Sequence, residues 1–524
     1  MKKVIVCDAI HEKGFELLRK EDVQIIDASE VSKEELLHLM KDAQVAITRS
    51  PTDVDEKFLN SSKKLKAVVR AGVGVDNVDL EACSKRGIIA MNVPTANTIA
   101  AVELTLAHLL ATARSFPQAH NHLKLDRVWK RELWYGVELS GKKLGVIGFG
   151  NIGSRVAIRA KAFDMEIIAY DPYIPSSKVT DLGMKYTKDF EDILKCDFIT
   201  IHTPKNKETT NIISYDEIAK MKDGVRLVNA ARGGLFDEKA LKDGLDSGKI
   251  AYAGIDVFSY EPAADHPLLD VKNISVTPHL GANTVESQEK IAVAAAEQAI
   301  AALRGTSYPN ALNLPFKEEE LPSFVKPYVE LIQKMAYLAA QINKYPISSI
   351  RLHAEGDVAK YAKSMLTFAI VGAFKDSLGE NINYVNAQFV AEEKGVKVDF
   401  VVDPKSGYDN KVTVKISTDK ELTSVSGTVF GESEQRIVNI NGFKTDFKPK
   451  GKMIVFKNKD VPGVIMEISS ILAKHKVNIA DFRLGRDNSS MALAVILVDE
   501  PIGKDILKAL NELPACIWAQ YAVL

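Results

Sequence analysis

The chain has little cysteine and no excess of charge of either sign. Its four cysteines, Cys7, Cys83, Cys196 and Cys516, are scattered and form neither a CxxC pair nor a metal-ligand spacing. We therefore expect reduced thiols, no metal site and a cytoplasmic location. The 68 basic and 69 acidic residues leave a net charge of −1, so neither nucleic acid nor an acidic membrane is indicated as a partner.

The sequence also lacks a long apolar run and the pattern of a secretory signal. A membrane-spanning helix needs about 20 apolar residues, and the longest candidate, Ile291–Leu303, is interrupted by Glu297 and Gln298. The first residues, MKKVIVCDAI, have the pattern of a strand and not that of a signal peptide. We expect no membrane partner. The length of 524 residues suits three or four domains.

What the sequence does have is a glycine-rich turn between a predicted strand and a predicted helix. Leu144–Ile147 is a short apolar run, and Gly148, Gly150 and Gly153 follow it in the spacing GxGxxG. The first glycine permits a tight turn, the second lets the backbone approach a pyrophosphate, and the third lets helix and strand pack closely. Taken alone, this spacing is equally well explained as a chance glycine turn.

The surroundings of the turn favour a dinucleotide. Asn151 and Ile152 fall at the start of the helix, where free N–H groups and the helix dipole favour an anion. Met165–Tyr170 is predicted to be the next strand, and a carboxylate at its end, Asp171, suits both ribose hydroxyls. Because this carboxylate would repel a 2′-phosphate, the sequence predicts NAD rather than NADP as the cofactor.

The first 310 residues alternate short apolar runs with helical segments, which predicts two α/β domains with parallel sheets. We expect a flavodoxin-like substrate domain over residues 1–98 and 285–310, and a Rossmann-type domain inserted over residues 99–284. Helices are predicted over Ala101–Arg114 and Gln288–Leu303. The predicted strands are Val4–Cys7, Val23–Ile26, Val45–Thr48, Ala67–Arg70, Ile88–Asn92, Phe198–Thr203, Arg226–Asn229, Gly254–Val257 and Ile274–Thr277.

Beyond residue 310 the pattern changes. The proline-containing stretch Asn310–Pro327, with the charged run Lys317–Glu320, indicates a linker. Residues 311–451 combine helices with β-rich segments such as Val396–Val402 and Lys411–Ile416, which indicates an α+β domain.

The last part, residues 452–524, is predicted to be a ferredoxin-like βαββαβ domain. A short final strand completes its order of elements. The preceding segments are a strand, a helix, two strands and a helix at Met453–Phe456, Val464–His475, Ile479–Leu484, Ala492–Val498 and Gly503–Leu510.

Three polar segments follow predicted strands of the second domain, where ligands bind in such sheets. Arg232, in NAARGG, can hold a carboxylate through two parallel hydrogen bonds. Taken alone, it is equally well explained as one half of a surface salt bridge. His279, in TPHLG, lies in a loop, although a lone histidine is more often structural. The other segment runs from Asp256 to Glu261 and Pro262.

These residue types suit the oxidation of a 2-hydroxy acid. The reaction removes a hydride from carbon and a proton from oxygen, and a nicotinamide takes the hydride. A histidine, with an ordinary pKa near 6.5, can take the proton, and a neighbouring carboxylate stabilises the imidazolium that results. An arginine can anchor the acid group so that the reacting carbon is oriented.

The chain resembles the NAD-dependent D-2-hydroxyacid dehydrogenases over residues 1–310. The resemblance rests on VIGFGNIG, Asp171, IHTP at 201–204, NAARGG, Glu261 with its proline, and TPHLGANT at 277–284. It implies that Arg232 orients the substrate carboxylate and carbonyl, and that His279 is the acid/base with Glu261 as its partner. The implied cofactor contacts are Gly148, Gly150, Asn151, Ile152, Gly153, Asp171, Thr203, Pro204, Ala230, Ala231, Arg232, Asp256 and His279.

Two further arginines indicate a second anionic group on the substrate. Arg49 and Arg70 follow predicted strands of the first domain and can face the second, although either alone is an ordinary solvated charge. Together with Arg232 they suit a phosphate. The segment RAGVGVDNVDLEACSKRGI also resembles the substrate loop of the D-3-phosphoglycerate dehydrogenases. That resemblance implies that the backbone approaches the substrate at Gly72, Val73 and Gly74.

The C-terminal domain resembles an ACT regulatory domain through Asp460–Gly463 and the following Asn478-Ile479. The middle region, residues 311–451, resembles the intervening, allosteric substrate-binding domain of the long-form phosphoglycerate enzymes. These resemblances imply L-serine as an effector, bound by Asn458, Asp460 and Asn478 across paired ACT domains of a homodimer or homotetramer. The alternative is that these residues only cap and turn the chain.

The resemblance as a whole implies NAD-dependent oxidation of 3-phospho-D-glycerate to 3-phosphohydroxypyruvate, the first step of L-serine biosynthesis. A side activity as a 2-oxoglutarate reductase stays open. One alternative is a glyoxylate or hydroxypyruvate reductase, which usually resembles only the first 310 residues. Another is a non-enzymatic NAD-sensing protein like the C-terminal-binding-protein corepressors, which the ACT-like tail and the Arg49/Arg70 pair disfavour.

Overall fold

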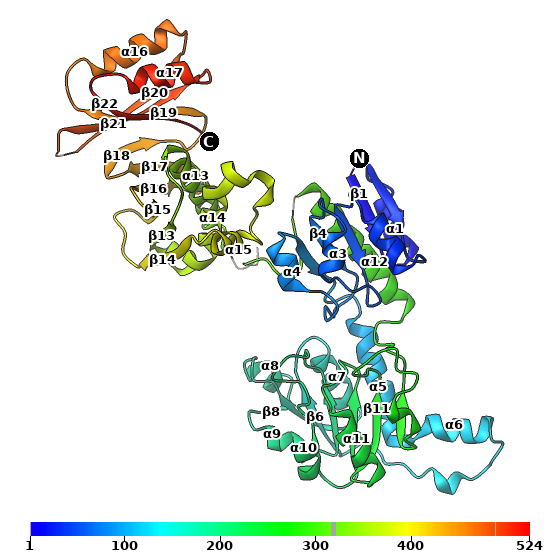
Figure 1. Cartoon of the computed structure of the whole chain (residues 1–524). Helices are drawn as coiled ribbons and strands as arrows, with labels where there is room; N and C mark the ends of the chain where they lie inside the picture. The colour runs from blue at the N-terminus through cyan, green and yellow to red at the C-terminus, as the bar shows by residue number, and fades with distance from the viewer. Residues whose placement is uncertain (1, 306, 316–320, 488) are drawn as a thin grey trace.

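The computed structural model describes residues 2–305, 307–315, 321–487 and 489–524. Within them the chain forms four β-sheets of five, seven, six and four strands. Figure 1 shows three bodies: the first sheet lies in the middle, the second below it, and the third and fourth together at the upper left.

The first sheet is parallel and carries helices on both faces. Its elements are β1 (Lys2–Val6), α1 (Glu12–Leu18), β2 (Val23–Asp27), α2 (Lys33–Leu39), β3 (Val45–Thr48), α3 (Glu56–Asn60), β4 (Ala67–Arg70), α4 (Leu80–Lys85), β5 (Ile89–Asn92) and, from later in the chain, α12 (Val285–Arg304). The strand order β2-β1-β3-β4-β5 is flavodoxin-like. Strands β3 and β5 are buried at every position, because α1 and α12 cover one face and α2, α3 and α4 the other.

The second sheet is parallel and of the Rossmann type. Its elements are α5 (Thr98–Arg114), α6 (Phe116–Lys124), η1 (Arg131–Leu133), β6 (Lys143–Ile147), α7 (Gly153–Lys161), β7 (Glu166–Tyr170), α8 (Ser177–Thr180), β8 (Lys185–Thr187), α9 (Phe190–Leu194), β9 (Phe198–Ile201), α10 (Tyr215–Lys220), β10 (Val225–Asn229), α11 (Glu238–Asp246), β11 (Ile250–Ile255), η2 (Pro267–Asp270) and β12 (Ile274–Val276). The order is β12-β11-β10-β9-β6-β7-β8. Between β6 and β9 the order reverses direction, and ligands bind at the carboxyl ends of strands beside such a reversal.

Two helices connect the first and second sheets. Helix α5 leaves β5 of the first sheet and packs on β10 and β11 of the second. Helix α12 returns the chain: it starts at Thr284, whose side chain accepts from Ser287 N–H, packs on β3 and β4, and ends at Gly305 in the left-handed conformation. The domain around the first sheet is therefore assembled from both ends of the first 305 residues.

An arm projects from the second sheet. Ser115 has φ +48° and ends α5, and α6 then runs away from the body, as Figure 1 shows. Helix α6 has no buried residue. The chain returns to the sheet at β6.

The third sheet is mixed and lies against long helices. Its elements are α13 (Lys326–Ile342), β13 (Ser349–Gly356), η4 (Asp357–Tyr361), α14 (Ala362–Leu378), η5 (Gly379–Asn381), α15 (Ala387–Glu393), β14 (Lys397–Asp403), β15 (Asn410–Ser417), β16 (Leu422–Phe430), β17 (Glu434–Ile440) and β18 (Phe443–Phe447). The order is β14-β13-β15-β16-β17-β18. Helices α13 and α14 pack against each other and against this sheet.

The fourth sheet is antiparallel, and both of its faces are covered. Its elements are β19 (Lys452–Lys459), α16 (Val464–Lys474), β20 (Ile479–Arg486), β21 (Met491–Val498), α17 (Lys504–Asn511) and β22 (Cys516–Val523), in the sheet order β20-β21-β19-β22. Helices α16 and α17 cover one face. The other face joins the core of the third sheet and α13 through Met453, Val455, Leu493, Val495 and Ala522. The last two sheets therefore share one apolar core.

The fold class predicted from the sequence is confirmed, with shifts at the ends of elements. Both long helices begin three residues before their predicted starts, at Thr98 and Val285. The predicted strand Phe198–Thr203 ends at Ile201, because the chain turns there toward the site described below. In the predicted linker, α13 already begins at Lys326, and the run Lys317–Glu320 lies outside the described residues.

No single helix among the described residues is long and apolar enough to cross a membrane. By length and composition alone, the bent pair of α5 and α6 passes the same test.

Candidate active site

The glycine turn after β6 leaves free the space that a pyrophosphate needs. Gly148 has φ +86°, and a Cβ on Gly153 would lie 2.0 Å from the Gly148 carbonyl oxygen, so both positions require glycine. A Cβ on Gly150 would meet no heavy atom within 4 Å. Because α7 begins at Gly153, the amides of Asn151 and Ile152 lie at its N-terminus.

Asp171 is held beside this turn by backbone N–H groups. Its Oδ2 accepts from Phe149 N–H at 2.9 Å, and its Oδ1 accepts from Tyr173 N–H at 3.0 Å. Next to Gly148, the Thr203 hydroxyl is buried without a hydrogen-bond partner among the described residues. A bound dinucleotide fits these three features: the unpaired buried hydroxyl of Thr203, the unfilled space at Gly150, and the Asp171 carboxylate at the end of the next strand.

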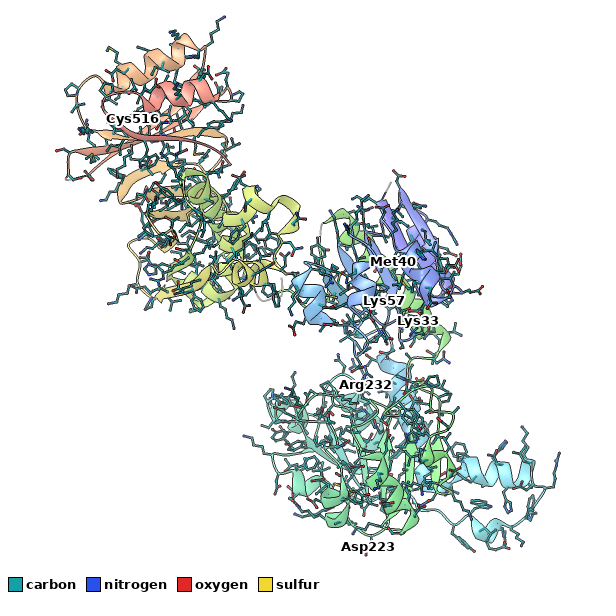
Figure 2. The ribbon with its side chains drawn as sticks, in the orientation of Figure 1. Lys33, Met40, Lys57, Asp223, Arg232 and Cys516 are labelled. Atoms are coloured by element: carbon teal, nitrogen blue, oxygen red, sulfur yellow. The ribbon has the colours of Figure 1, made fainter. Side chains whose placement is uncertain are left out.

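Arg232 follows β10 and reaches the loop after β4. Its Nε donates to Asp76 Oδ2 at 3.2 Å, and its Nη1 donates to the Ala231 carbonyl at 2.6 Å. A Cβ on Gly74 would lie 2.2 Å from Arg232 Nη2, so the guanidinium lies directly on the loop backbone. Figure 2 labels Arg232 at the edge of the lower body that faces the middle one. The two sheets therefore build one site together.

Arg70 and Arg49 lie on the other side of this site. Arg70 Nη2 donates to Ser50 Oγ at 2.7 Å, while its Nε is buried without a partner among the described residues. Burial, and then the nearby charges of Arg232 and Arg49, lower the pKa of Arg70 to about 10. Three neighbouring cations, one with an unused N–H group, favour a multiply charged anion.

His279 and Glu261 form a pair on the second sheet. His279 Nδ1 lies 2.7 Å from Glu261 Oε2, and Phe258 N–H donates to Glu261 Oε1 at 3.1 Å. Burial alone would raise the pKa of Glu261, but the contacts with His279, the Phe258 N–H and the charge of Arg232 together lower it. An ionised Glu261 accepts the Nδ1 proton, which leaves His279 Nε2 free to exchange a proton with a substrate.

Asp256 lies beneath the loop that carries His279. Its backbone oxygen accepts from His279 N–H at 2.9 Å, and its carboxylate accepts from Leu280 N–H at 2.7 Å and Gly281 N–H at 3.0 Å. Burial raises the pKa of Asp256 against these stabilising contacts. Three successive amides thus surround Asp256, which is fully buried. Its predicted contact with the cofactor stays a prediction, since here the carboxylate binds the loop.

The other predicted residues border the same region. A Cβ on Gly72 would lie 1.5 Å from Arg70 Nη1, and the Val73 carbonyl accepts from Asn92 Nδ2 at 2.7 Å. Ala230 and Ala231 directly follow β10, and Pro204 follows Thr203 after β9. The glycine turn, the arginines and the His279 pair all follow carboxyl ends of parallel strands, as the sequence predicted.

The three predicted effector residues are only partly brought together. Asn458 and Asp460 line a hollow of about 430 Å³ at the start of α16, and Asp460 pairs with Arg486 at 3.1 Å. Asn478 does not line it: its Nδ2 donates to Asp499 Oδ2 at 2.7 Å. Within one chain these residues therefore do not form a single site.

Sequence reasoning missed three residues that hold the site together. Asp76 forms an ion pair with Arg232. Sequence reasoning did not single it out, although it lies in the segment that resembles a substrate loop. Thr277 lies in the quoted TPHLG motif and donates to Asp256 Oδ1 at 2.6 Å. His108 hydrogen-bonds with Thr277 from α5, and the one available signal was a polar residue on the buried face of a predicted helix.

Among the described residues, no group of three or more His, Cys, Asp or Glu side chains is placed to hold a metal ion.

Comparison with known proteins covers almost the whole chain. Residues 106–281 match the family model for the D-isomer specific 2-hydroxyacid dehydrogenase, NAD binding domain. Residues 324–441 match the D-3-phosphoglycerate dehydrogenase intervening domain, and residues 452–515 match the ACT domain. The chain therefore contains an NAD-binding domain, in agreement with the geometry of the glycine turn.

Curated relatives match over almost their full length. D-3-phosphoglycerate dehydrogenase of Bacillus subtilis is 36% identical over 98% of this chain and 98% of its own. The protein of the same name from Methanocaldococcus jannaschii is 37% identical, with 98% of each chain covered. The crystal structure of D-lactate dehydrogenase from Aquifex aeolicus, complexed with NAD and lactic acid, is 29% identical with a TM-score of 0.52, over 58% of this chain and 96% of that one.

Proposed function

The chain belongs to the D-3-phosphoglycerate dehydrogenase family, and we propose that it oxidises 3-phospho-D-glycerate to 3-phosphohydroxypyruvate with NAD, as the first step of L-serine biosynthesis. One observation carries the choice of substrate. Three arginines from two sheets converge, and the buried Arg70 Nε has no described partner. A substrate with a carboxylate at one end and a phosphate at the other matches this set of charges.

Each anionic end of the substrate has its own arginines in this proposal. Arg232 binds the carboxylate, because it follows β10 of the sheet that carries the His279 pair and its charge helps to lower the pKa of Glu261. Arg70 and Arg49 bind the phosphate from the side of the first sheet. In this structure Asp76 holds Arg232 Nε, so Arg232 Nη2 remains available for the carboxylate.

The proton of the substrate hydroxyl goes to His279 Nε2. Glu261 holds the other ring nitrogen, fixes the tautomer and stabilises the imidazolium that forms. When bound, NAD supplies the acceptor for the C2 hydride. Gly150, the α7 amides, Asp171 and Thr203 are the residues that would hold it.

The experiment is a steady-state assay in the reverse direction, following NADH consumption with 3-phosphohydroxypyruvate. We expect kcat/KM for this keto acid to exceed that for hydroxypyruvate, glyoxylate and 2-oxoglutarate by at least tenfold. Hydroxypyruvate is the matched control, since it lacks only the phosphate.

Two outcomes would contradict the proposal. Equal kcat/KM for hydroxypyruvate and its phosphate ester would indicate a hydroxypyruvate or glyoxylate reductase. NADH binding without consumption of any of these acids would indicate an NAD-sensing protein.

We also propose L-serine as an effector at the hollow beside α16. Asp460 would pair with the ammonium group and the α16 amides with the carboxylate. Because Asn478 points elsewhere within one chain, the proposal takes it from a second copy. Exposed apolar side chains around the hollow, Val461, Ile465, Met466 and Leu484, support a surface that a second ACT domain covers.

Titration of the whole protein with L-serine tests this effector site, by calorimetry and by activity. We expect binding in the micromolar to millimolar range, lost in both Asp460→Ala and Asn478→Ala. D-serine is the matched control ligand. Unchanged heat and unchanged activity at 10 mM L-serine, an order-of-magnitude ceiling for a weak site, would contradict the proposal.

The arm around α6 supports the proposed homodimer or homotetramer. Trp129 and Tyr135 are 80% and 89% exposed, which is costly for aromatic residues unless a second copy covers them. Phe116, Leu123, Leu125 and Leu133 are also exposed there. We expect Trp129→Glu to halve the mass in analytical ultracentrifugation, whereas an unchanged mass would exclude the arm as an interface.

The proposed location is the cytoplasm. All four cysteines are free, and burial raises the pKa of Cys83 and Cys196 to about 12, so these thiols stay protonated and unreactive.

A further inference from the structure

The edge strand β14 of the third sheet is unusually exposed and apolar. It has β13 as its one neighbour in the sheet order. Phe400, Val401 and Val402 are 42%, 44% and 51% exposed, although they stand on alternating faces of the strand. A seven-residue edge strand of this kind is normally shortened, charged or covered, because its free N–H and C=O groups invite another strand.

The sequence of β14, KVDFVVD, is complementary to itself in antiparallel pairing. Centred on Phe400, such a pair places Lys397 opposite Asp403 of the other copy at both ends. On the opposite face, Val398 meets Val402, and the two Phe400 side chains meet at the centre. The end charges and the apolar stripe of Val398, Phe400 and Val402 therefore match at the same register, in which Asp399 lies opposite Val401 of the other copy.

The remaining charge on β14 is already neutralised within the chain. Asp399 makes a two-bond ion pair with Arg351 of β13, at 2.7 and 2.6 Å. By contrast, neither Lys397 nor Asp403 has an ion pair with any described residue. The two charges that the register would pair are thus the two without an ion pair among the described residues, although Asp403 Oδ1 accepts from Lys405 N–H at 2.9 Å.

We propose that β14 pairs antiparallel with β14 of a second copy of this chain, joining two six-stranded sheets across a two-fold axis. The contact is isologous, since the same strand serves on both sides. The proposal concerns assembly and does not depend on which hydroxy acid the site takes.

Charge reversal tests the register directly. Lys397→Asp and Asp403→Lys, each alone, place like charges opposite each other at both ends, so we expect each to halve the mass in analytical ultracentrifugation. The double variant Lys397→Asp/Asp403→Lys restores both pairs, and we expect the native mass. Lys420→Asp, an exposed lysine in the turn before β16, is the matched control.

The outcomes are decisive in either direction. A native mass for both single variants, or failure of the double variant to recover it, would overturn the proposal. NADH turnover measured on the same samples reports folding of the first two sheets, so a change in assembly is distinguished from loss of structure.

A second, independent inference comes from a buried chain of hydrogen bonds behind His279. His108 of α5 has Nδ1 3.0 Å from Ser275 Oγ and Nε2 2.8 Å from Thr277 Oγ1. Thr277 Oγ1 in turn donates to Asp256 Oδ1 at 2.6 Å. A Cβ on Gly254 would lie 2.8 Å from His108 Cβ, so the neighbouring strand leaves room for this side chain only because residue 254 is glycine.

The directions of these bonds follow from Asp256. An ionised carboxylate only accepts, so the Thr277 hydroxyl donates to it and must accept from His108 Nε2–H. Nδ1 then carries no proton and accepts from the Ser275 hydroxyl. His108 stays neutral, because burial lowers its pKa to about 4.

This series of hydrogen bonds ends at the backbone of His279, the proposed acid/base residue. Asp256 accepts hydrogen bonds from the amides of residues 279–281, and His279 has φ +54°, a left-handed conformation that residues with a side chain rarely adopt. Fixing Asp256 from behind therefore fixes the direction in which His279 points.

The geometry points to His108 as a positioning residue for the proposed reaction, acting through Thr277 and Asp256 on His279. This inference rests on the proposed role of His279 and not on the identity of the substrate. His108 lies on α5, the helix that connects the two sheets, and through it α5 would help to position the acid/base residue of the second sheet.

The test compares His108→Leu, which removes both bonds, with His108→Gln, whose amide can still donate to Thr277. We expect His108→Leu to lower kcat about tenfold at unchanged KM for NADH, since misplaced groups cost orders of magnitude in rate. His108→Gln should stay within about threefold of the native kcat. Thr277→Val, nearly equal in volume, should behave like His108→Leu.

Rates are expressed relative to the native protein with whichever keto acid it reduces best, so the result stands even if the preferred acid is not the phosphorylated one. A kcat for His108→Leu and Thr277→Val within twofold of native would overturn the inference. Equal losses in the Leu and Gln variants would also overturn it, since they would show that the side chain only fills space.

Discussion

At the scale of single residues, the site divides its work between the two sheets. His279 and Glu261 come from the second sheet, while Arg49 and Arg70 come from the first, and Arg232 touches both. In the proposed reaction the proton therefore moves on one side of the substrate, and the far anionic group is bound on the other. Each contribution can be removed separately.

Removing the imidazole should stop the proton transfer without disturbing cofactor binding. We expect His279→Ala to lower kcat by about 10²–10⁴, the range for a lost acid/base group. NADH affinity should change little, because the glycine turn and Asp171 lie on other loops. The measurement is kcat by steady-state kinetics with Kd for NADH by fluorescence titration, and a near-native kcat would contradict the assignment.

The preference for NAD should depend on the carboxylate of Asp171. Two amides fix it beside the glycine turn, so a 2′-phosphate would meet a negative charge that cannot turn away. We expect kcat/KM with NAD to exceed that with NADP by at least about tenfold, and Asp171→Ala to reduce this ratio. Equal values for the two cofactors with the native protein would show that Asp171 does not face the ribose.

The phosphate role of Arg70 predicts a selective loss. Arg70→Ala should lower kcat/KM for 3-phosphohydroxypyruvate by about 10²-fold, as expected for a lost bond between charged groups, and should affect hydroxypyruvate much less. Arg86→Ala is the control, because Arg86 belongs to the same domain and bonds only to Asn60 among the described contacts. Equal losses for both keto acids would remove the phosphate role.

At the scale of elements, the turn from β6 into α7 separates structural glycines from a ligand-facing one. A methyl group at residue 153 would strike the Gly148 carbonyl, whereas one at residue 150 would meet nothing in the protein. We expect Gly153→Ala to lower the free energy of unfolding by about 1–3 kcal/mol, the usual cost of overpacking.

Gly150→Ala is the matched variant for this turn. It should leave the urea midpoint unchanged but weaken NADH binding, since its methyl group would occupy the space left for the pyrophosphate. Urea unfolding and fluorescence titration on both variants check this. Unchanged NADH affinity in Gly150→Ala would mean that the dinucleotide does not cross the turn there.

At the scale of the whole molecule, the ACT sheet and the intervening sheet form one core. Met453, Val455 and Leu493 of the ACT sheet belong to the same apolar core as α13, and Gln341 of α13 exchanges two hydrogen bonds with the backbone of Val523, at 3.2 and 3.0 Å. The proposed effector, bound on the far side of the ACT sheet, would therefore act on a body that includes the intervening domain.

Deleting residues 452–524 should expose this shared face. We expect amides of α13 to exchange with solvent at least about tenfold faster in the truncated chain, since a buried helix face becomes accessible. A chain ending at residue 315 is the control, and its first two sheets should keep the native melting temperature. Hydrogen-exchange mass spectrometry makes the measurement, and unchanged protection of α13 would contradict the shared core.

The sequence by itself determined the local chemistry of this protein. The GxGxxG spacing, Asp171 at the next strand end, and the order of apolar runs predicted the Rossmann-type and flavodoxin-like sheets, because turns, strand faces and helix starts depend on neighbouring residues. The same reasoning placed Arg232, Glu261 and His279 at strand ends, where parallel sheets gather them.

Only the tertiary structure decided which of these residues meet, and what supports them. Arg232 binds Asp76 across 156 residues and His108 bonds to Ser275 across 167, so neither contact leaves a local pattern in the sequence. Asp256 is buried under the His279 loop, and Asn478 lies apart from Asp460, because the surrounding packing directs each side chain. Spacing along a chain specifies elements, whereas contacts between distant residues exist only once those elements have packed.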